Sequence, residues 1–213
     1  MPKIALITLR NDYLNDRKER RDSIDVELYS FLKKFNFIPF LIPNDYEFIK
    51  NINLFIQTKD IGCILFSGGN DLEKNRNIGG LNTYHKRDEI ELYLIKYCLK
   101  NKIPLIGICR GFQMIADFLG ADIEKVEGHV NTIHEVTLEN IKNINVNSFH
   151  SFGLKNKNLP DNIEPLGYCK FDGTLECFRT EIPFRSLNFM WHPERDYGSK
   201  EEVYKLIKDF LFE

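Results

Sequence analysis

The sequence lacks the features that mark membrane, disulfide-rich and zinc-finger proteins. Among its 213 residues, no apolar run approaches the roughly 20 residues that a transmembrane helix needs. Only five cysteines are present, without a C-x-x-C pair, and they stand at positions 63, 98, 109, 169 and 177. This odd number and scattered spacing argue against a disulfide framework or a zinc site, and they favour a reducing compartment. We therefore expect no membrane association, no metal site and a cytoplasmic location.

An excess of charge of one sign is also missing. The chain has 29 basic and 31 acidic residues, a formal net charge of −2, so it lacks the basic footprint of a nucleic-acid-binding protein. No internal repeat, low-complexity tract or Pro/Gly/Ser-rich linker interrupts it. With 43% hydrophobic and 28% charged residues, its composition is that of a globular protein. We expect a single domain spanning residues 1–213.

Apolar and amphipathic segments alternate over the first two-thirds of the chain. The predicted strands are Lys3–Leu9, Phe37–Ile42, Ile61–Phe66 and Pro104–Ile108, and the predicted helical segments between them are Ile24–Phe35, Tyr46–Ile56 and Arg87–Lys100. This alternation is typical of an open parallel sheet with right-handed crossovers.

The pattern changes after Gly120. Short β-branched segments separated by turns occur at Thr132–Leu138, Asn143–Asn147, Glu176–Thr180 and Ser186–Trp191, and Val203–Leu211 forms a last amphipathic helix. The predicted fold is therefore α/β, with an open, mostly parallel sheet, flanking helices and a more antiparallel C-terminal β region.

The best candidate for a nucleophile is Cys109. An apolar strand leads into it, an amphipathic helix follows it, and Gly107 and Gly111 flank it. Small neighbours on both sides permit the sharp strand-to-helix turn that exposes a nucleophile, as in G-x-S-x-G enzymes. The start of the helix also favours a thiolate. The alternative is an inert cysteine in a tight turn, which is how we interpret the other four cysteines.

A nucleophilic thiol needs a histidine and a group that orients it. His192 follows a predicted strand, Pro193 fixes the backbone after it, and Glu194 stands where a carboxylate could accept a hydrogen bond from the ring. The alternative for His-Pro-Glu is an ordinary turn at the end of a strand.

A glycine pair follows the third predicted strand, in Ser67-Gly68-Gly69. Loops at the carboxyl ends of parallel strands form the ligand crevice, and glycines let backbone N–H groups approach a developing oxyanion. We expect the N–H groups of Gly69 and Arg110 to be those donors. A flexible β–α turn is the alternative.

Four motifs together resemble class I glutamine amidotransferase-like enzymes. They are Ser67-Gly68-Gly69, Gly107–Gln113, Val146–His150 and Trp191–Glu194, in the order found in that family. Further features are similar to its free-standing γ-glutamyl hydrolase branch, which contains γ-glutamyl-γ-aminobutyrate hydrolase; they are Arg87-Asp88 with Glu91, Gly128-His129, and Asp172-Gly173 ahead of Glu176. The resemblance spans essentially the whole chain.

The resemblance implies a flavodoxin-like sheet and a triad of Cys109 as nucleophile, His192 as base and Glu194 as its orienter. It also implies a set of substrate-binding residues, namely Gly68, Tyr84, Arg87, Gln113, Asn147, Ser148, Phe149 and His150. Many relatives have His-Gln after the third motif, whereas Ser151 and Phe152 stand here. That departure leaves the leaving-group side of the pocket open.

The segment from Asp16 to Ile24 is unusually charged. It is similar to the N-terminal loop of a bacterial subset of the family associated with sugar and capsule biosynthesis. Arg17, Arg20 and Arg21 would suit phosphate through bidentate hydrogen bonds. A solvated helix start with i,i+4 ion pairs explains the same residues equally well.

We predict a hydrolase that forms a thioester at Cys109 and releases glutamate from a small-molecule γ-glutamyl amide. The amide could be a nucleotide-linked amidate of capsule assembly, and no cofactor is required. One alternative is the glutaminase subunit of an amidotransferase, which would pass ammonia to a partner synthetase. Another is an inactive binding module on the same scaffold. A homodimer is compatible with the family, although no feature of the sequence demands it.

Overall fold

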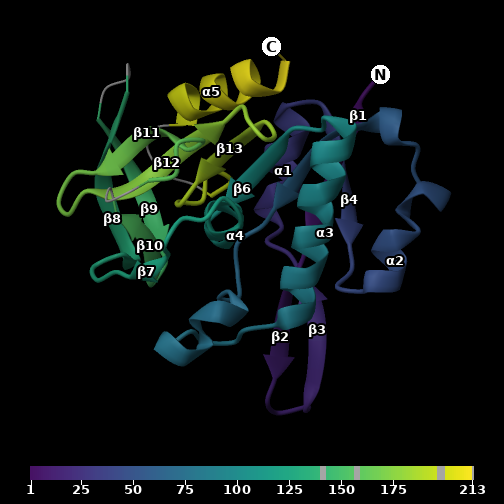
Figure 1. Ribbon diagram of the computed structural model, residues 1–213, viewed down its shortest axis with the longest axis horizontal. Helices are drawn as coiled ribbons and strands as arrows, with labels where there is room; N and C mark the ends of the chain where they lie inside the picture. The colour runs from purple at the N-terminus through teal and green to yellow at the C-terminus, as the bar shows by residue number, and fades with distance from the viewer. Residues whose placement is uncertain (140–142, 156–158, 196–199, 213) are drawn as a thin grey trace.

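The computed structural model describes residues 1–139, 143–155, 159–195 and 200–212 (Figure 1). Its helices are α1 (Glu27–Lys34), α2 (Tyr46–Lys50), α3 (His85–Asn101), α4 (Arg110–Phe118) and α5 (Lys200–Phe212). Its strands are β1 (Lys3–Thr8), β2 (Arg10–Leu14), β3 (Glu19–Ser23), β4 (Phe37–Ile42), β5 (Ile61–Phe66), β6 (Leu105–Ile108), β7 (Glu124–Lys125), β8 (Val130–Leu138), β9 (Ile144–Phe149), β10 (Phe152–Lys155), β11 (Glu164–Cys169), β12 (Thr174–Thr180) and β13 (Ser186–Phe189).

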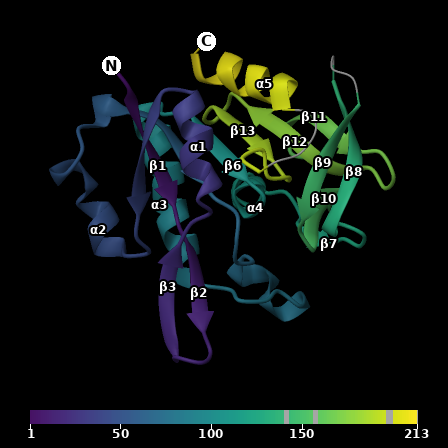
Figure 2. The same cartoon turned by 180° about the vertical axis from the view of Figure 1, so that it is seen from behind.

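The centre of the fold is a parallel sheet in the order β4-β1-β5-β6-β13. Successive side chains point to opposite faces of a strand. In β1, Leu6 therefore joins the apolar cluster that includes residues of α2, α3 and α4, whereas Ala5 and Ile7 join the cluster that includes residues of α1 and α5. Helices thus cover both faces (Figures 1 and 2), and the carboxyl ends of the strands meet at one edge.

The sheet changes direction where β12 pairs with β13 in antiparallel fashion. From there it continues antiparallel through β11, β8 and β9, while β10 pairs with β12 and with β7. The predicted fold class, a parallel core followed by a more antiparallel C-terminal region, is confirmed. The strands β7, β10 and β11 were not predicted, because they are short or lack clear alternation.

The charged segment before α1 is a β-hairpin and not a helix start. Strands β2 and β3 pair from Arg10↔Ser23 to Leu14↔Glu19, and the hairpin projects beyond the carboxyl end of β1 (Figure 1). Polar contacts between the strands hold it, including Asn11 Nδ2 to Asp22 Oδ1 at 2.8 Å. The helix expected over Ile24–Phe35 therefore begins only at Glu27.

Two other observations concern the helices. The helical segment expected over Tyr46–Ile56 is divided, with α2 ending at Lys50 and a 3-10 turn following at Ile52–Leu54. Asn51, whose side-chain amide bonds to the carbonyl of Glu47, lies at the break. Within the described residues, no helix combines the length and the apolar character that crossing a membrane requires.

Candidate active site

Cys109 lies between β6 and α4 in a strained backbone conformation, with φ 52° and ψ −101°. Few residues other than glycine adopt a positive φ, and such strain is concentrated at functional sites. The two flanking glycines make the turn possible. A Cβ at Gly111 would lie 2.3 Å from the carbonyl oxygen of Phe66, and one at Gly107 would lie 2.6 Å from Asn188 Oδ1. Only glycine fits at either position.

His192 and Glu194 follow β13 at the same edge of the sheet. His192 Nδ1 lies 2.7 Å from Glu194 Oε1, and the side chains of His192 and Cys109 line the same cavity next to Gly68. All three residues are buried, with exposures of 7% for Cys109, 4% for His192 and 5% for Glu194. The structure thus brings a thiol, an imidazole and a carboxylate to one site, and these are the groups that nucleophilic catalysis by a cysteine requires.

The surroundings of His192 favour its protonated form. Burial by itself lowers the pKa of this imidazole, but the negative charge of Glu194 and the hydrogen bond with Cys109 outweigh that effect. The pKa of His192 is therefore well above its ordinary value. A protonated imidazole beside the sulfur is suited to deliver a proton to a leaving nitrogen.

Asn147 was expected to bind substrate, but its side chain holds the backbone of His192. Its Nδ2 donates to the carbonyl of His192 at 2.9 Å, and its Oδ1 accepts from the amide of the same residue at 3.0 Å. Both ends of the amide group are therefore engaged. The structure gives Asn147 a positioning role for the histidine.

The glycine loop after β5 lies directly against the histidine and the cysteine. A Cβ at Gly68 would lie 2.6 Å from His192 Cε1 and 3.6 Å from Cys109 Cβ. Gly69 has a φ of +111°, which favours glycine. Arg110 opens α4, where its backbone N–H has no partner within the helix. These positions fit the expected oxyanion donors, Gly69 and Arg110.

Arg87 holds this loop by buried hydrogen bonds, and it lines neither of the two cavities next to His192. Its guanidinium is fully buried and donates to the carbonyl oxygens of Ser67 and Gly68 and to Glu91. The sequence-based expectation that Arg87 binds substrate is corrected by this geometry. Arg87 stands in the first turn of α3, on the helix face that packs against the sheet. Its side chain therefore points inward and reaches the Ser67–Gly69 loop.

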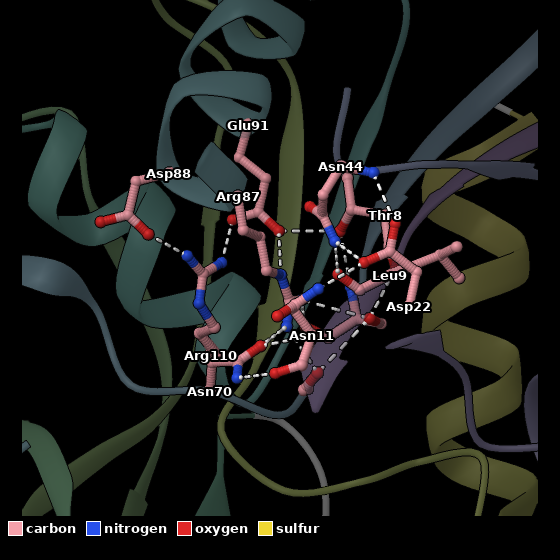
Figure 3. A network of polar contacts seen from close by, with 12 residues as sticks. Thr8, Leu9, Asn11, Asp22, Asn44, Asn70, Arg87, Asp88, Glu91 and Arg110 are labelled. Atoms are coloured by element: carbon pink, nitrogen blue, oxygen red, sulfur yellow. Dashed lines mark hydrogen bonds and ion pairs between the residues drawn. The ribbon is translucent and has the colours of Figure 1, made fainter. Parts of the chain in front are cut away.

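Arg87 belongs to a buried polar network that joins α3, α4 and β1 (Figure 3). Glu91 is its centre, since this fully buried carboxylate pairs with Arg87 and Arg110 and accepts from Thr8 Oγ1 at 2.8 Å. Arg110 also pairs with Asp88. Burial raises the pKa of Glu91, but Arg110 and Arg87 outweigh this effect and lower it. The carboxylate is therefore ionised, and through Arg87 and Arg110 it ties the Ser67–Gly69 loop to the start of α4.

A cavity of about 360 Å³ opens beside the thiol. Its lining includes Cys109, Gln113, Phe149 and His192. Gln113 donates its amide to the carbonyl of Phe152 at 3.0 Å, while its Oε1 has no hydrogen-bond partner within the described structure. Phe149 packs edge-on against His192, with ring centroids 5.9 Å apart. Gln113 and Phe149 are thus placed where substrate contact was expected.

Three other expected substrate residues are engaged elsewhere. Ser148 is fully buried and donates to the carbonyl of His129 at 2.7 Å. His150 borders the cavity, but its Nδ1 contacts the carbonyl of Phe152 and its Nε2 faces Glu176. Tyr84 lies at the start of α3 beneath the guanidinium of Arg20. These contacts orient the strands and the hairpin around the cavity.

The arginines that reach the cavity are not those expected from the sequence. Arg17 and Arg21 lie exposed on the hairpin, and Arg20 is held between Tyr13 and Tyr84, so none of the three lines the cavity. Arg10 and Arg195 line it instead, together with His192. Sequence reasoning missed them because neither lies in a cluster, although Arg10 does stand at the carboxyl end of the first predicted strand.

Known proteins with similar sequences belong to the family that the four motifs resemble. The family model of class I glutamine amidotransferases matches residues 20–213. The γ-glutamyl-CDP-amidate hydrolase of Campylobacter jejuni is 34% identical over 183 residues, which cover 83% of this chain and 82% of that protein. The carbamoyl phosphate synthase small chain of Buchnera aphidicola is 36% identical over 115 residues, which cover 53% of this chain and 30% of that protein.

A solved structure of PurLQS from Thermotoga maritima is similar in fold. It superimposes with a TM-score of 0.68 at 16% sequence identity, covering 99% of this chain and 100% of that chain. At this identity the likeness is evidence for the fold alone.

Proposed function

The chain belongs to the class I glutamine amidotransferase family, and we propose that it is a cysteine hydrolase that cleaves a γ-glutamyl amide bond. The proposed substrate is γ-glutamyl-CDP-amidate, which the name of the Campylobacter jejuni relative contains. We propose that the products are glutamate and cytidine diphosphoramidate, the latter for capsule biosynthesis. One observation carries the proposal. Cys109, on a strained turn, lines the same cavity as His192, whose Nδ1 lies 2.7 Å from Glu194 Oε1.

In the first half of the proposed reaction, the thiolate of Cys109 attacks the γ-carbonyl carbon of the substrate. The carbonyl oxygen becomes an oxyanion that accepts hydrogen bonds from the backbone N–H groups of Gly69 and Arg110. When this intermediate collapses, the C–N bond breaks and His192 donates its proton to the leaving nitrogen. A γ-glutamyl thioester on Cys109 remains.

In the second half, water attacks the thioester. His192, now neutral, takes a proton from the water while Glu194 holds the ring in place. The carbon–sulfur bond breaks, glutamate leaves and the thiolate of Cys109 is regenerated together with protonated His192. The raised pKa of His192 supports this cycle, because the resting pair then holds the proton that the leaving group needs.

The glutamyl group fits the cavity beside the thiol. We propose that Gln113, which lines this cavity and whose buried Oε1 has no hydrogen-bond partner within the described structure, would accept a hydrogen bond from the substrate ammonium group. Phe149 packs against His192 at the side of the cavity. The guanidinium of Arg195 lies over the Phe149 ring, 4.9 Å from its centroid. The leaving group would then extend toward the second hollow, which Arg10 and Arg195 also line.

We propose that Arg10 and Arg195 bind the diphosphate of the leaving group. Each already pairs with a carboxylate, Arg10 with Asp12 and Arg195 with Asp25, so their guanidinium groups are held at the cavity rim. Hydrogen bonds to charged groups contribute about 1.5–3 kcal/mol each. Replacing either arginine by alanine should therefore raise the KM for the nucleotide substrate about 10- to 100-fold.

The matched control is Arg17→Ala, on the exposed tip of the same hairpin. It should leave the KM unchanged, as should Arg10→Ala with a γ-glutamyl substrate that carries no phosphate. Steady-state kinetics on both substrates measures this. An equal rise in KM for Arg17→Ala would contradict the proposal and indicate that the hairpin tip binds the phosphate.

The proposed activity is tested by measuring free glutamate from a panel of substrates. The panel contains glutamine, γ-glutamyl-γ-aminobutyrate, a γ-glutamyl peptide and γ-glutamyl-CDP-amidate, each with wild type and with Cys109→Ala. We expect Cys109-dependent release that is fastest from the nucleotide substrate. Release from none of them, or at equal rates from both proteins, would overturn the proposal.

A second candidate function is the glutaminase subunit of an amidotransferase. The similarity to the carbamoyl phosphate synthase small chain favours it, although the matched region is only 30% of that protein. Release from glutamine alone, and only after a synthetase partner is added, would select this function. For either function we propose a cytoplasmic location, because the five cysteines are free in the structure.

A further inference from the structure

A second group of ionisable side chains lies apart from the triad, among the antiparallel strands. Three histidines surround one carboxylate oxygen. Glu176 Oε1, on β12, lies 3.4 Å from His129 Nδ1, 3.5 Å from His134 Nε2 and 3.4 Å from His150 Nε2. His129 directly precedes β8, His134 lies within β8 and His150 directly follows β9. Nothing in the proposed reaction uses this cluster.

The cluster is buried and its inward atoms lack hydrogen-bond partners. Glu176 and His129 are 0% exposed, His150 is 3% exposed and His134 is 7% exposed. Within the described structure, both carboxylate oxygens of Glu176, His129 Nδ1, His150 Nε2 and both ring nitrogens of His134 make no hydrogen bond. Buried charges are normally paired or bound to a metal, so these unpartnered atoms require an explanation.

The outer nitrogens of two rings are already engaged. His150 Nδ1 lies 3.0 Å from the carbonyl oxygen of Phe152, so it must donate there. His129 Nε2 lies 3.3 Å from Asp172 Oδ2, which makes it a donor as well. In the neutral rings, Nε2 of His150 and Nδ1 of His129 then present lone pairs to an ionised carboxylate. A cation between them satisfies all three atoms.

This arrangement has the form of a metal site. Histidines that bind metals almost always donate their other ring N–H to a carboxylate or a backbone carbonyl, as these two do. In a tetrahedral Zn²⁺ site with bonds of about 2.0–2.2 Å, adjacent ligand atoms lie about 3.3–3.5 Å apart. The separations of 3.4, 3.5 and 3.4 Å from Glu176 Oε1 match this spacing.

We propose that His129, His150 and Glu176, with His134 beside them, form a buried binding site for a divalent transition-metal ion of the Zn²⁺ type. The ligand atoms of the first three residues all lie within 4.8 Å of one another. Cys169 forms a second such group with His129 and His134, so a sulfur ligand is also within reach. Imidazole and carboxylate ligands suit zinc and its neighbours better than they suit calcium or magnesium.

A metal bound at this site would stabilise the structure and would take no part in the reaction at Cys109. It joins β8, β9 and β12 at the point where the chain leaves β9. Its ligand His150 directly follows Phe149, which packs against His192. A metal bound there would fix the aromatic wall of the substrate cavity.

The test is metal binding by the full chain, purified without a histidine tag and stripped with a chelator. Titration with Zn²⁺ against a chromophoric chelator should find one ion bound per chain, and Co²⁺ should give the intense visible absorption of a tetrahedral centre. Asp172→Asn removes the negative charge of the outer partner of His129, keeps an oxygen that can accept from Thr174, and should weaken Zn²⁺ binding about 10- to 100-fold. Glu176→Gln should abolish it.

The control variant is His85→Gln, which alters an exposed histidine at the start of α3 and should bind Zn²⁺ like wild type. Circular dichroism establishes that each variant is folded, and Asp172→Asn carries the test if Glu176→Gln does not fold. Stripped wild-type protein that is folded but binds neither Zn²⁺ nor Co²⁺ would overturn the proposal. So would Asp172→Asn and Glu176→Gln variants that are folded and bind Zn²⁺ as tightly as wild type does.

Discussion

Replacing Cys109 by alanine should reduce glutamate release about 10⁴-fold or more, since the loss of the nucleophile from a comparable triad costs on the order of 10⁶-fold in kcat. The fall should be in kcat, because the cavity lined by Gln113 and Phe149 is left in place. Single-turnover and steady-state kinetics on the best substrate of the panel measure it. No thioester should accumulate in the variant.

The same substitution should also change the titration of His192. The pKa of this imidazole is raised by Glu194 and by Cys109, so removing the sulfur should lower it. A raised pKa contributes stability that is complete below the unfolded value and is lost as the pH rises through the folded value. In Cys109→Ala that loss should occur at lower pH, which NMR titration of the ring can follow.

Cys98→Ala is the matched control for both measurements. Cys98 is buried on α3, where burial raises the pKa of its thiol, and it does not line the substrate cavity. Its replacement should leave kcat and the His192 titration unchanged. If Cys98→Ala lost activity as Cys109→Ala does, the decline would report damage to the fold and the nucleophile would have to be sought elsewhere.

Replacing Glu91 by glutamine should lower the free energy of unfolding by about 3–5 kcal/mol, because two buried guanidinium groups lose their shared counter-charge. Arg87 and Arg110 are 0% and 1% exposed, so water cannot take over that role. Urea denaturation measures the change. Activity of the fraction that remains folded should fall as well, since Arg87 holds the carbonyls of Ser67 and Gly68.

The contribution of Glu91 also has a defined pH window. Its pKa is lowered in the folded protein, so its stabilising effect is present above the ordinary value for glutamate and is lost as the pH falls through the folded value. Glu89→Gln, an exposed position on the same helix, should change stability by no more than about 0.5 kcal/mol. Equal unfolding midpoints for Glu91→Gln and Glu89→Gln would show that the buried network around Glu91 does not stabilise the Ser67–Gly69 loop.

The sequence was most informative where function rests on local backbone geometry. Gly107, Cys109 and Gly111 predict a strained strand-to-helix turn because only glycine tolerates such close backbone approach, and each flanking Cβ would collide. Likewise, apolar strands alternating with amphipathic helices fix a parallel sheet whose carboxyl ends meet at one edge. That edge brings residues 67–69 and 109 together, whereas residue 192 joins them because β13 pairs with β6 in parallel, although the sequence placed this strand in the antiparallel region.

Side-chain direction was decided by the tertiary structure. Arg87 and Asn147 belong to motifs of the family, yet both face backbone groups, since buried carbonyls and amides need partners. Arg17, Arg20 and Arg21 looked suited to phosphate as a cluster in sequence. The hairpin keeps them away from the cavity, because Arg17 lies exposed in its turn, Arg20 packs on Tyr13 and Tyr84, and Arg21 is exposed.

The sequence by itself therefore determined the α/β fold and the candidate nucleophile, because these follow from chain-local patterns of glycine and apolar residues, while the class of reaction was implied by the resemblance to a known family. Only the tertiary structure decided which arginine side chains line the cavity. It also brought His129, His134 and His150 around Glu176. Those residues lie on separate strands, and their encounter depends on sheet order and register. Neither can be read from spacing along the chain, because pairing between strands is a long-range property.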